Sequence, residues 1–100
     1  MARDKSYHDE LIKDLKDHEE AAAYLSAAWE QTLEGDEESY TFFLVALRNV
    51  AEAQGGLGSL AKKTHIRREQ LYRILSPRGN PGLKKIGVLL TSLGFVLKIV

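Results

Sequence analysis

The sequence of 100 residues contains no cysteine, only two prolines and a single tryptophan. Without cysteine the chain can form neither a disulfide nor a thiolate metal site. No apolar stretch approaches the ~20 residues that a membrane-spanning helix needs, and the first residues lack the basic and then apolar layout of a signal peptide. We therefore expect a cytoplasmic protein that has one domain, one modest core and no membrane partner.

The net charge of zero conceals an opposition between the two halves of the chain. Residues 1–50 carry five Lys/Arg against twelve Asp/Glu, a net charge of −7, and residues 51–100 carry nine against two, a net charge of +7. Such halves suggest two partners of opposite character, and nucleic acid is the expected partner of the basic half. Solubility alone explains the acidic half equally well.

Residues 57–75, LGSLAKKTHIRREQLYRIL, have the pattern of two short helices joined by a tight turn. Apolar residues recur at helical spacing in both helices, and the opposite face of the second carries Arg and Gln. Such a helix can lie in the major groove of DNA, because Arg pairs bidentately with guanine and Gln with adenine. The pattern predicts a helix-turn-helix, and a helical hairpin with a solvated basic face is the alternative. The expected DNA-binding residues are Lys62, Lys63, Arg67, Arg68, Gln70, Arg73, Arg78, Lys84 and Lys85.

Two residues of this segment are unusual for a helix-turn-helix. The turn position that needs a positive φ is His65 rather than glycine, and the N-cap of the second helix is Arg67 rather than serine or threonine. Arginine accepts no hydrogen bond, which forfeits roughly 1 kcal/mol of capping, and it places a cation at the positive end of the helix dipole. A phosphate or base partner explains such an arginine better than solvent does.

The remaining residues predict further helices and one strand. We expect helices over residues 6–16, over 17–34 with Asp17 as N-cap, and from a cap at Asp36 to Gly55. A last helix is expected over 81–93 with Asn80 as N-cap, and its inward residues are Leu83, Ile86, Leu90 and Leu93. Residues 95–100 alternate and predict a strand. A lone strand needs a partner, which a second copy can supply, so a homodimer is expected through Phe95, Leu97 and Ile99.

The expected fold is therefore an all-α bundle of about five to six helices with a short C-terminal β-strand. We divide the single domain into an N-terminal helical extension (1–35), a helix-turn-helix bundle (36–94) and the strand (95–100). An enzyme is the alternative from another class, and it would use His8-Asp9-Glu10 or His18-Glu19-Glu20. Neither group has two histidines at ligand spacing, and adjacent side chains on a helix point apart. We therefore expect no catalytic residues, no metal and no cofactor.

Four segments carry a resemblance to a known family: DLKDHEEAAAYLSAAWE, FFLVALRNVAEAQGGLGSLAKKT, REQLYRILSPRGNPGL and LGFVLKIV. They resemble the antidote (antitoxin) proteins of type II addiction modules, a family similar in fold to the lambda-repressor-like (Xre-type) regulators. The resemblance implies a dimer that binds operator DNA, neutralises a small ribonuclease-type toxin and represses its own operon. It also implies that residues 67–73 form the recognition helix. A stand-alone Xre-type repressor without a toxin partner is the alternative.

The acidic segment over residues 6–38 is the expected surface for such a toxin. A protein that binds or cleaves RNA presents cations to phosphate, so its inhibitor gains by offering carboxylates to the same surface. Binding energy is usually concentrated in apolar anchors. The expected toxin-binding residues are Tyr7, Leu11, Ile12 and Leu15.

Overall fold

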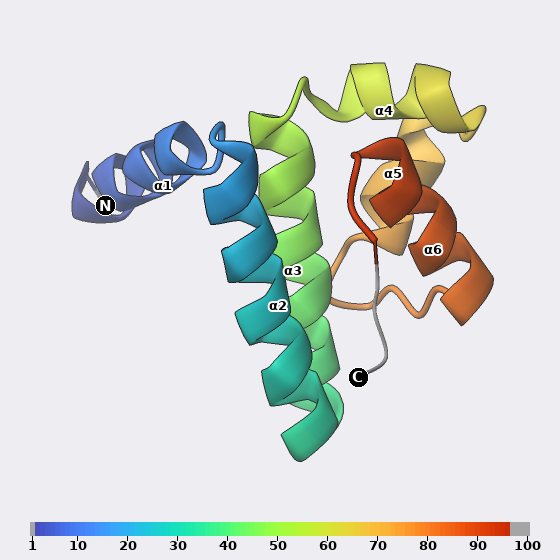
Figure 1. Cartoon of the computed structure of the whole chain (residues 1–100), viewed down its shortest axis with the longest axis horizontal. Coiled ribbons are helices and arrows are strands. Elements are labelled where there is room, and N and C mark those ends of the chain that lie inside the picture. The colour runs from blue at the N-terminus through green and yellow to red at the C-terminus, as the bar shows by residue number, and fades with distance from the viewer. Residues whose placement is uncertain (1, 97–100) are drawn as a thin grey trace.

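The structure is a computed structural model that describes residues 2–96, with the side chains of residues 2–5 and 37 excepted. This part of the chain forms six helices and no strand, which confirms the predicted all-helical class (Figure 1). The helices are α1 (Ala2–Asp14), α2 (His18–Glu34), α3 (Glu37–Ala53), α4 (Leu57–Thr64), α5 (Arg68–Ile74) and α6 (Leu83–Ser92).

The long helices α2 and α3 lie side by side and antiparallel (Figure 1). Both begin at an aspartate, as predicted. The Asp17 carboxylate accepts hydrogen bonds from the backbone N–H groups of Glu19 and Glu20, at 2.9 and 3.2 Å. Asp36 does the same for Glu38 and Ser39 at the start of α3. These caps satisfy N–H groups that have no partner within the helix, and they fix where each helix begins.

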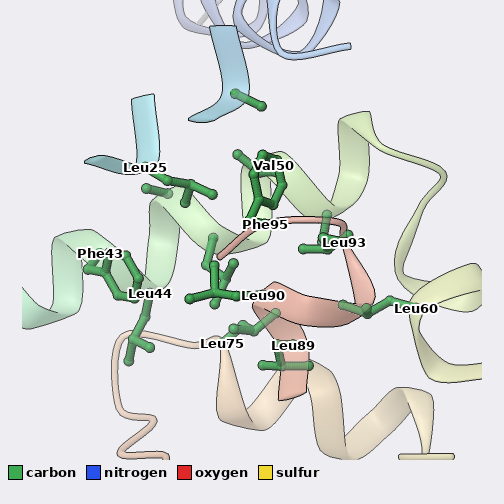
Figure 2. Close-up of a cluster of buried hydrophobic side chains, with 14 of the residues drawn as sticks. Leu25, Phe43, Leu44, Val50, Leu60, Leu75, Leu89, Leu90, Leu93 and Phe95 are labelled. Atoms are coloured by element: carbon green, nitrogen blue, oxygen red, sulfur yellow. The ribbon is translucent and has the colours of Figure 1, made fainter. Parts of the chain in front are cut away.

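Helix α3 is the centre of the hydrophobic core. Its fully buried residues recur at helical spacing and include Leu44, Leu47 and Val50. Figure 2 shows side chains of α2, α4 and α6 converging on this helix, together with Leu75 and Phe95. In Figure 1, α1 and α2 lie on one side of α3, and α4 to α6 lie on the other. The core therefore separates the acidic helices α1 and α2 from the basic segment, which is formed by α4 to α6.

Helix α1 is attached to the upper end of the α2–α3 pair (Figure 1). The amide of Gln54, just after α3, donates hydrogen bonds to the backbone carbonyls of Leu15 and Lys16 at 2.7 and 3.1 Å. Leu15 is only 2% exposed and belongs to the core. This arrangement fixes the carboxyl end of α1, a helix too short to be stable alone.

The start of α6 differs from the prediction. The helix has Gly82 as its N-cap and begins at Leu83, not at Pro81 after an Asn80 cap. The hydroxyl of Tyr40 on α3 donates a hydrogen bond to the Pro81 carbonyl at 2.8 Å, which holds Pro81 in the preceding loop. Leu83, which we expected to point inward, is 71% exposed. The buried residues of α6 and its end are Ile86, Leu89, Leu90 and Leu93.

Of the predicted C-terminal strand, the structure describes only Phe95 and Val96, and neither residue is in a strand. Gly94 ends α6 with φ 88°, and the Phe95 N–H then donates to the Leu90 carbonyl at 2.8 Å, a common way to close a helix. This turn directs the Phe95 ring against the core, and the ring also stacks on the exposed His18 with ring centroids 4.2 Å apart. Residues 97–100 lie outside the described part of the chain.

Candidate nucleic-acid interface

Helices α4 and α5 pack against each other and against the core through leucines. Leu57 and Leu60 of α4, with Leu71 of α5 and Leu75 at its end, are all buried, as predicted. Ala61, Ile66 and Ile74 are partly buried against the same cluster. With its apolar side used in this way, α5 turns its polar side away from the protein.

The turn between the two helices has the backbone geometry expected from its sequence. His65 adopts the left-handed conformation, with φ 59° and ψ 25°, which histidine tolerates better than most residues. The Thr64 hydroxyl donates to the Leu60 carbonyl at 2.8 Å and accepts from the Ile66 N–H at 3.3 Å. Thr64 thereby closes α4 and holds the first residue after the left-handed one.

The amino end of α5 carries a cation where a capping residue is usual. Arg67 is the N-cap residue, in an extended conformation, and its side chain forms no capping hydrogen bond. Glu69 is the acidic residue of the first turn. The side chains of Arg67, Arg68, Gln70 and Arg73 are all exposed, so the polar face predicted for this helix does face solvent.

Lysines of the neighbouring elements extend this positive surface. Lys62 and Lys63 are exposed in the last turn of α4. Arg78 and Lys84 are exposed on the loop before α6 and in its first turn, and Lys85 is partly buried. Within the described part of the chain, no carboxylate forms an ion pair with any of the eight cations between residues 62 and 85. Their charge is therefore available to a polyanion.

An open groove of about 810 Å³ brings four of these cations together. Arg73, Arg78, Lys84 and Lys85 line it, and its apolar lining includes Ile66, Ile74 and Val88, while none of its lining residues is acidic. A groove with this charge favours phosphate groups. The structure does not bring the five remaining predicted residues into the groove: Lys62, Lys63, Arg67, Arg68 and Gln70.

Two residues beside Arg68, Tyr72 and Arg48, were not among the predicted site residues. The Arg68 guanidinium lies over the Tyr72 ring, 5.7 Å from its centroid, and donates a hydrogen bond to the Tyr72 hydroxyl at 3.4 Å. The guanidinium of Arg48, on α3, lies over the same ring at 5.2 Å. The spacing of Arg68 and Tyr72 by four residues is a usable signal in a helix, whereas nothing in the sequence brings Arg48 to α5.

The predicted toxin-binding residues fall into three classes of exposure. Tyr7 is 73% exposed on α1, and Leu11 and Ile12 are partly buried. Leu15 lies in the core of its own chain, so its side chain is not accessible to a partner and its assignment to a binding surface is corrected. The apolar surface that α1 offers is therefore centred on Tyr7.

The predicted dimerisation residues are placed only in part. The ring of Phe95 is buried against His18 and the core, which leaves little of it for a second copy. Leu97 and Ile99 lie outside the described residues. Exposed apolar side chains occur elsewhere, notably Leu33 on α2 and Phe42 on α3.

The histidines considered for metal or acid–base chemistry have other contacts. His8 Nε2 lies 3.4 Å from a carboxylate oxygen of Glu52, and His18 stacks on Phe95. In the described residues, no three side chains of the metal-binding types gather in one place. Across residues 2–96, no helix combines the length and the apolar character needed to cross a bilayer.

Comparison with known proteins adds one finding. A family model described as a probable addiction module antidote protein matches residues 6–100. The match covers nearly the whole chain, including the apolar residues of α1 and the exposed cations of α4 to α6. No curated protein and no solved structure matches the chain.

Proposed function

Because the chain belongs to the family of probable addiction module antidote proteins, we propose that it is a DNA-binding antitoxin of a type II module. In this proposal α4 and α5 form a helix-turn-helix of the lambda-repressor-like (Xre) type. The protein neutralises a small ribonuclease-type toxin and represses its own operon as a homodimer. Membership of the family itself implies a toxin partner and a regulatory rather than a catalytic role.

The observation that carries the DNA-binding part is the positive surface of α4 to α6, whose cations form no ion pair with the carboxylates that the structure describes. Eight cations lie between residues 62 and 85, against the single acid Glu69. The exposed side of α5 offers Arg and Gln, the side chains suited to base edges in the major groove. The groove between α5 and α6 offers cations suited to the phosphate backbone. These two surfaces adjoin at Arg73, so one duplex can contact both.

Binding to the upstream region of the protein's own operon tests this assignment. We expect affinity to fall steeply with salt, by about 10³-fold between 50 and 200 mM if about six phosphates are contacted. Arg67→Ala and Arg73→Ala should reduce the preference for the operator over a scrambled duplex. Lys62→Ala should weaken binding to both duplexes about equally. Lys13→Ala, an exposed cation on α1, is the matched control and should change neither.

The toxin-binding part is tested by capture of the protein encoded beside this chain. Removing residues 1–16 is a poor test, because it deletes the core residue Leu15. Tyr7→Ala leaves the core intact and should speed dissociation of the toxin. Leu33→Ala, an equally exposed apolar residue on α2, is the control. Unchanged toxin binding by the Tyr7 variant would place the surface elsewhere, and no binding by the unaltered chain would favour the stand-alone repressor.

A further inference from the structure

A series of side-chain contacts runs from α1 to α5. His8 on α1 lies 3.4 Å from Glu52 on α3, and Glu52 lies 3.7 Å from the Arg48 Nε one turn earlier. The Arg48 guanidinium lies 5.2 Å from the centroid of the Tyr72 ring. Tyr72 in turn contacts Arg68 through its ring and its hydroxyl. One end of the series is therefore on the acidic side of the protein, and the other is on the exposed face of α5.

We propose that Arg48 and Tyr72 are positioning residues that orient Arg68 for reading a base, an inference that rests on the proposed DNA-binding function. Neither residue needs to touch DNA for this role. Tyr72 supplies a ring face and a hydroxyl to the Arg68 guanidinium, and Arg48 fixes the ring from a different helix. Arg48 is itself oriented by Glu52, and both partly exposed side chains belong to α3, the helix at the centre of the fold.

The position of Tyr72 supports this role. It lies beside the fully buried Leu71, yet it is 38% exposed and does not belong to the core cluster. A large ring left at the surface has area available to cations, and a guanidinium over such a ring is attracted by its electrons. Both of its cationic neighbours use this property.

Orienting Arg68 in advance should affect selectivity. A free arginine on a short exposed helix has many rotamers, and ordering it on binding costs free energy. An arginine already held in one place loses less freedom when it pairs with guanine. It is also less able to adapt to other bases. Positioning therefore raises the preference for one sequence more than it raises binding to all sequences.

The test compares selectivity in two backgrounds. The dissociation constants for the operator duplex and for a scrambled duplex of equal length are measured at one salt concentration, for the unaltered chain and for Arg48→Met. A surface cation–π contact predicts a loss of selectivity of about two- to five-fold. Arg48→Lys keeps a cation at this position and should therefore lose much less selectivity than Arg48→Met. Tyr72→Phe, which keeps the ring, should lose only the part due to the hydroxyl.

The second background is Arg68→Ala, in which Arg48→Met should cause no further loss of selectivity. A merely structural role of Arg48 predicts the opposite, the same loss with and without Arg68, accompanied by a lower thermal unfolding midpoint. The NMR order parameter of the Arg68 Nε–H group, measured without DNA, should fall in Arg48→Met. Unchanged selectivity and an unchanged order parameter would overturn the inference. An unaltered chain that binds no duplex selectively would instead overturn the proposed function on which it rests.

Discussion

Arg67 lies at the N-cap of α5 and forms no capping hydrogen bond there. A serine at this position would accept a hydrogen bond from the first turn and would remove a cation from the positive end of the helix. We expect Arg67→Ser to raise the free energy of unfolding by about 1 kcal/mol, as measured by urea denaturation. The same variant should bind the operator more weakly, because it loses a cation.

Arg67→Ala separates the two effects of that substitution. It removes the charge as serine does but supplies no cap, so it should weaken DNA binding to the same extent without the part of the stability gain that is due to capping. If the serine variant is no more stable than the alanine variant, the missing capping hydrogen bond does not limit the stability of α5.

Replacing Leu15 or Tyr7 by alanine should change the free energy of unfolding by different amounts, although both residues belong to the same short segment. Leu15 is buried, so Leu15→Ala should lower the free energy of unfolding by about 2–5 kcal/mol. Tyr7 is largely exposed, and Tyr7→Ala should stay within about 0.5 kcal/mol of the unaltered chain. Thermal unfolding of both variants checks this difference. Equal effects would mean that α1 does not dock as described.

At the scale of helices and loops, the contact between Tyr40 and Pro81 joins α3 to the loop before α6. Burial raises the pKa of the Tyr40 hydroxyl above its ordinary value of 10.0, because the charged phenolate would be poorly solvated there. The pKa is thus higher in the folded than in the unfolded state. The stability that this group contributes is complete below pH 10 and is lost as the pH rises through the folded pKa.

Denaturation at a series of pH values tests the sign of this effect. As the pH rises above about 10, the ordinary tyrosine pKa, the unaltered chain should lose stability more steeply than Tyr40→Phe. The remaining tyrosines are common to both chains, so the difference isolates Tyr40. At neutral pH the variant should be less stable by about 1 kcal/mol, because the Pro81 carbonyl loses its donor. Parallel pH profiles would contradict the assignment.

The starts of the helices differ in how well the sequence predicted them. The caps at Asp17 and Asp36 were predicted because a cap depends on residues two or three positions away. The start of α6 was predicted wrongly, because it depends on a tyrosine 41 positions before Pro81. Local patterns decide where a helix can begin, and a tertiary hydrogen bond decides where this one does.

For the molecule as a whole, periodicity predicted which side chains of α5 face outward, but it did not predict which of them gather. Arg73 and Lys84 line one groove only because the loop between them folds back against α3. Phe95 was expected at an intermolecular interface, and its place in the core follows from the left-handed turn at Gly94. Such placements depend on the path of the chain between elements, which short patterns do not specify.

The homodimer remains a prediction at this scale. Ending the chain after Val96 keeps the buried Phe95 and removes residues 97–100, so the core is preserved. If these residues join two copies, sedimentation should show a monomer and operator binding should weaken, because paired half-sites ~34 Å apart are no longer contacted together. A dimer that survives this truncation would move the interface to the exposed apolar residues of α2 and α3.

The separation of acidic helices from the basic segment by the core makes the protein an electric dipole. Near a duplex, whose electrostatic potential is negative, such a molecule would experience a torque that turns α4 to α6 toward the DNA and α1 and α2 away from it. This rotation begins within about a Debye length, ~10 Å at 0.1 M salt, before any contact forms. In the proposed complex with DNA, the carboxylates of α1 and α2 would face solvent. A basic partner can then approach from the side remote from the DNA without competing for the same charges.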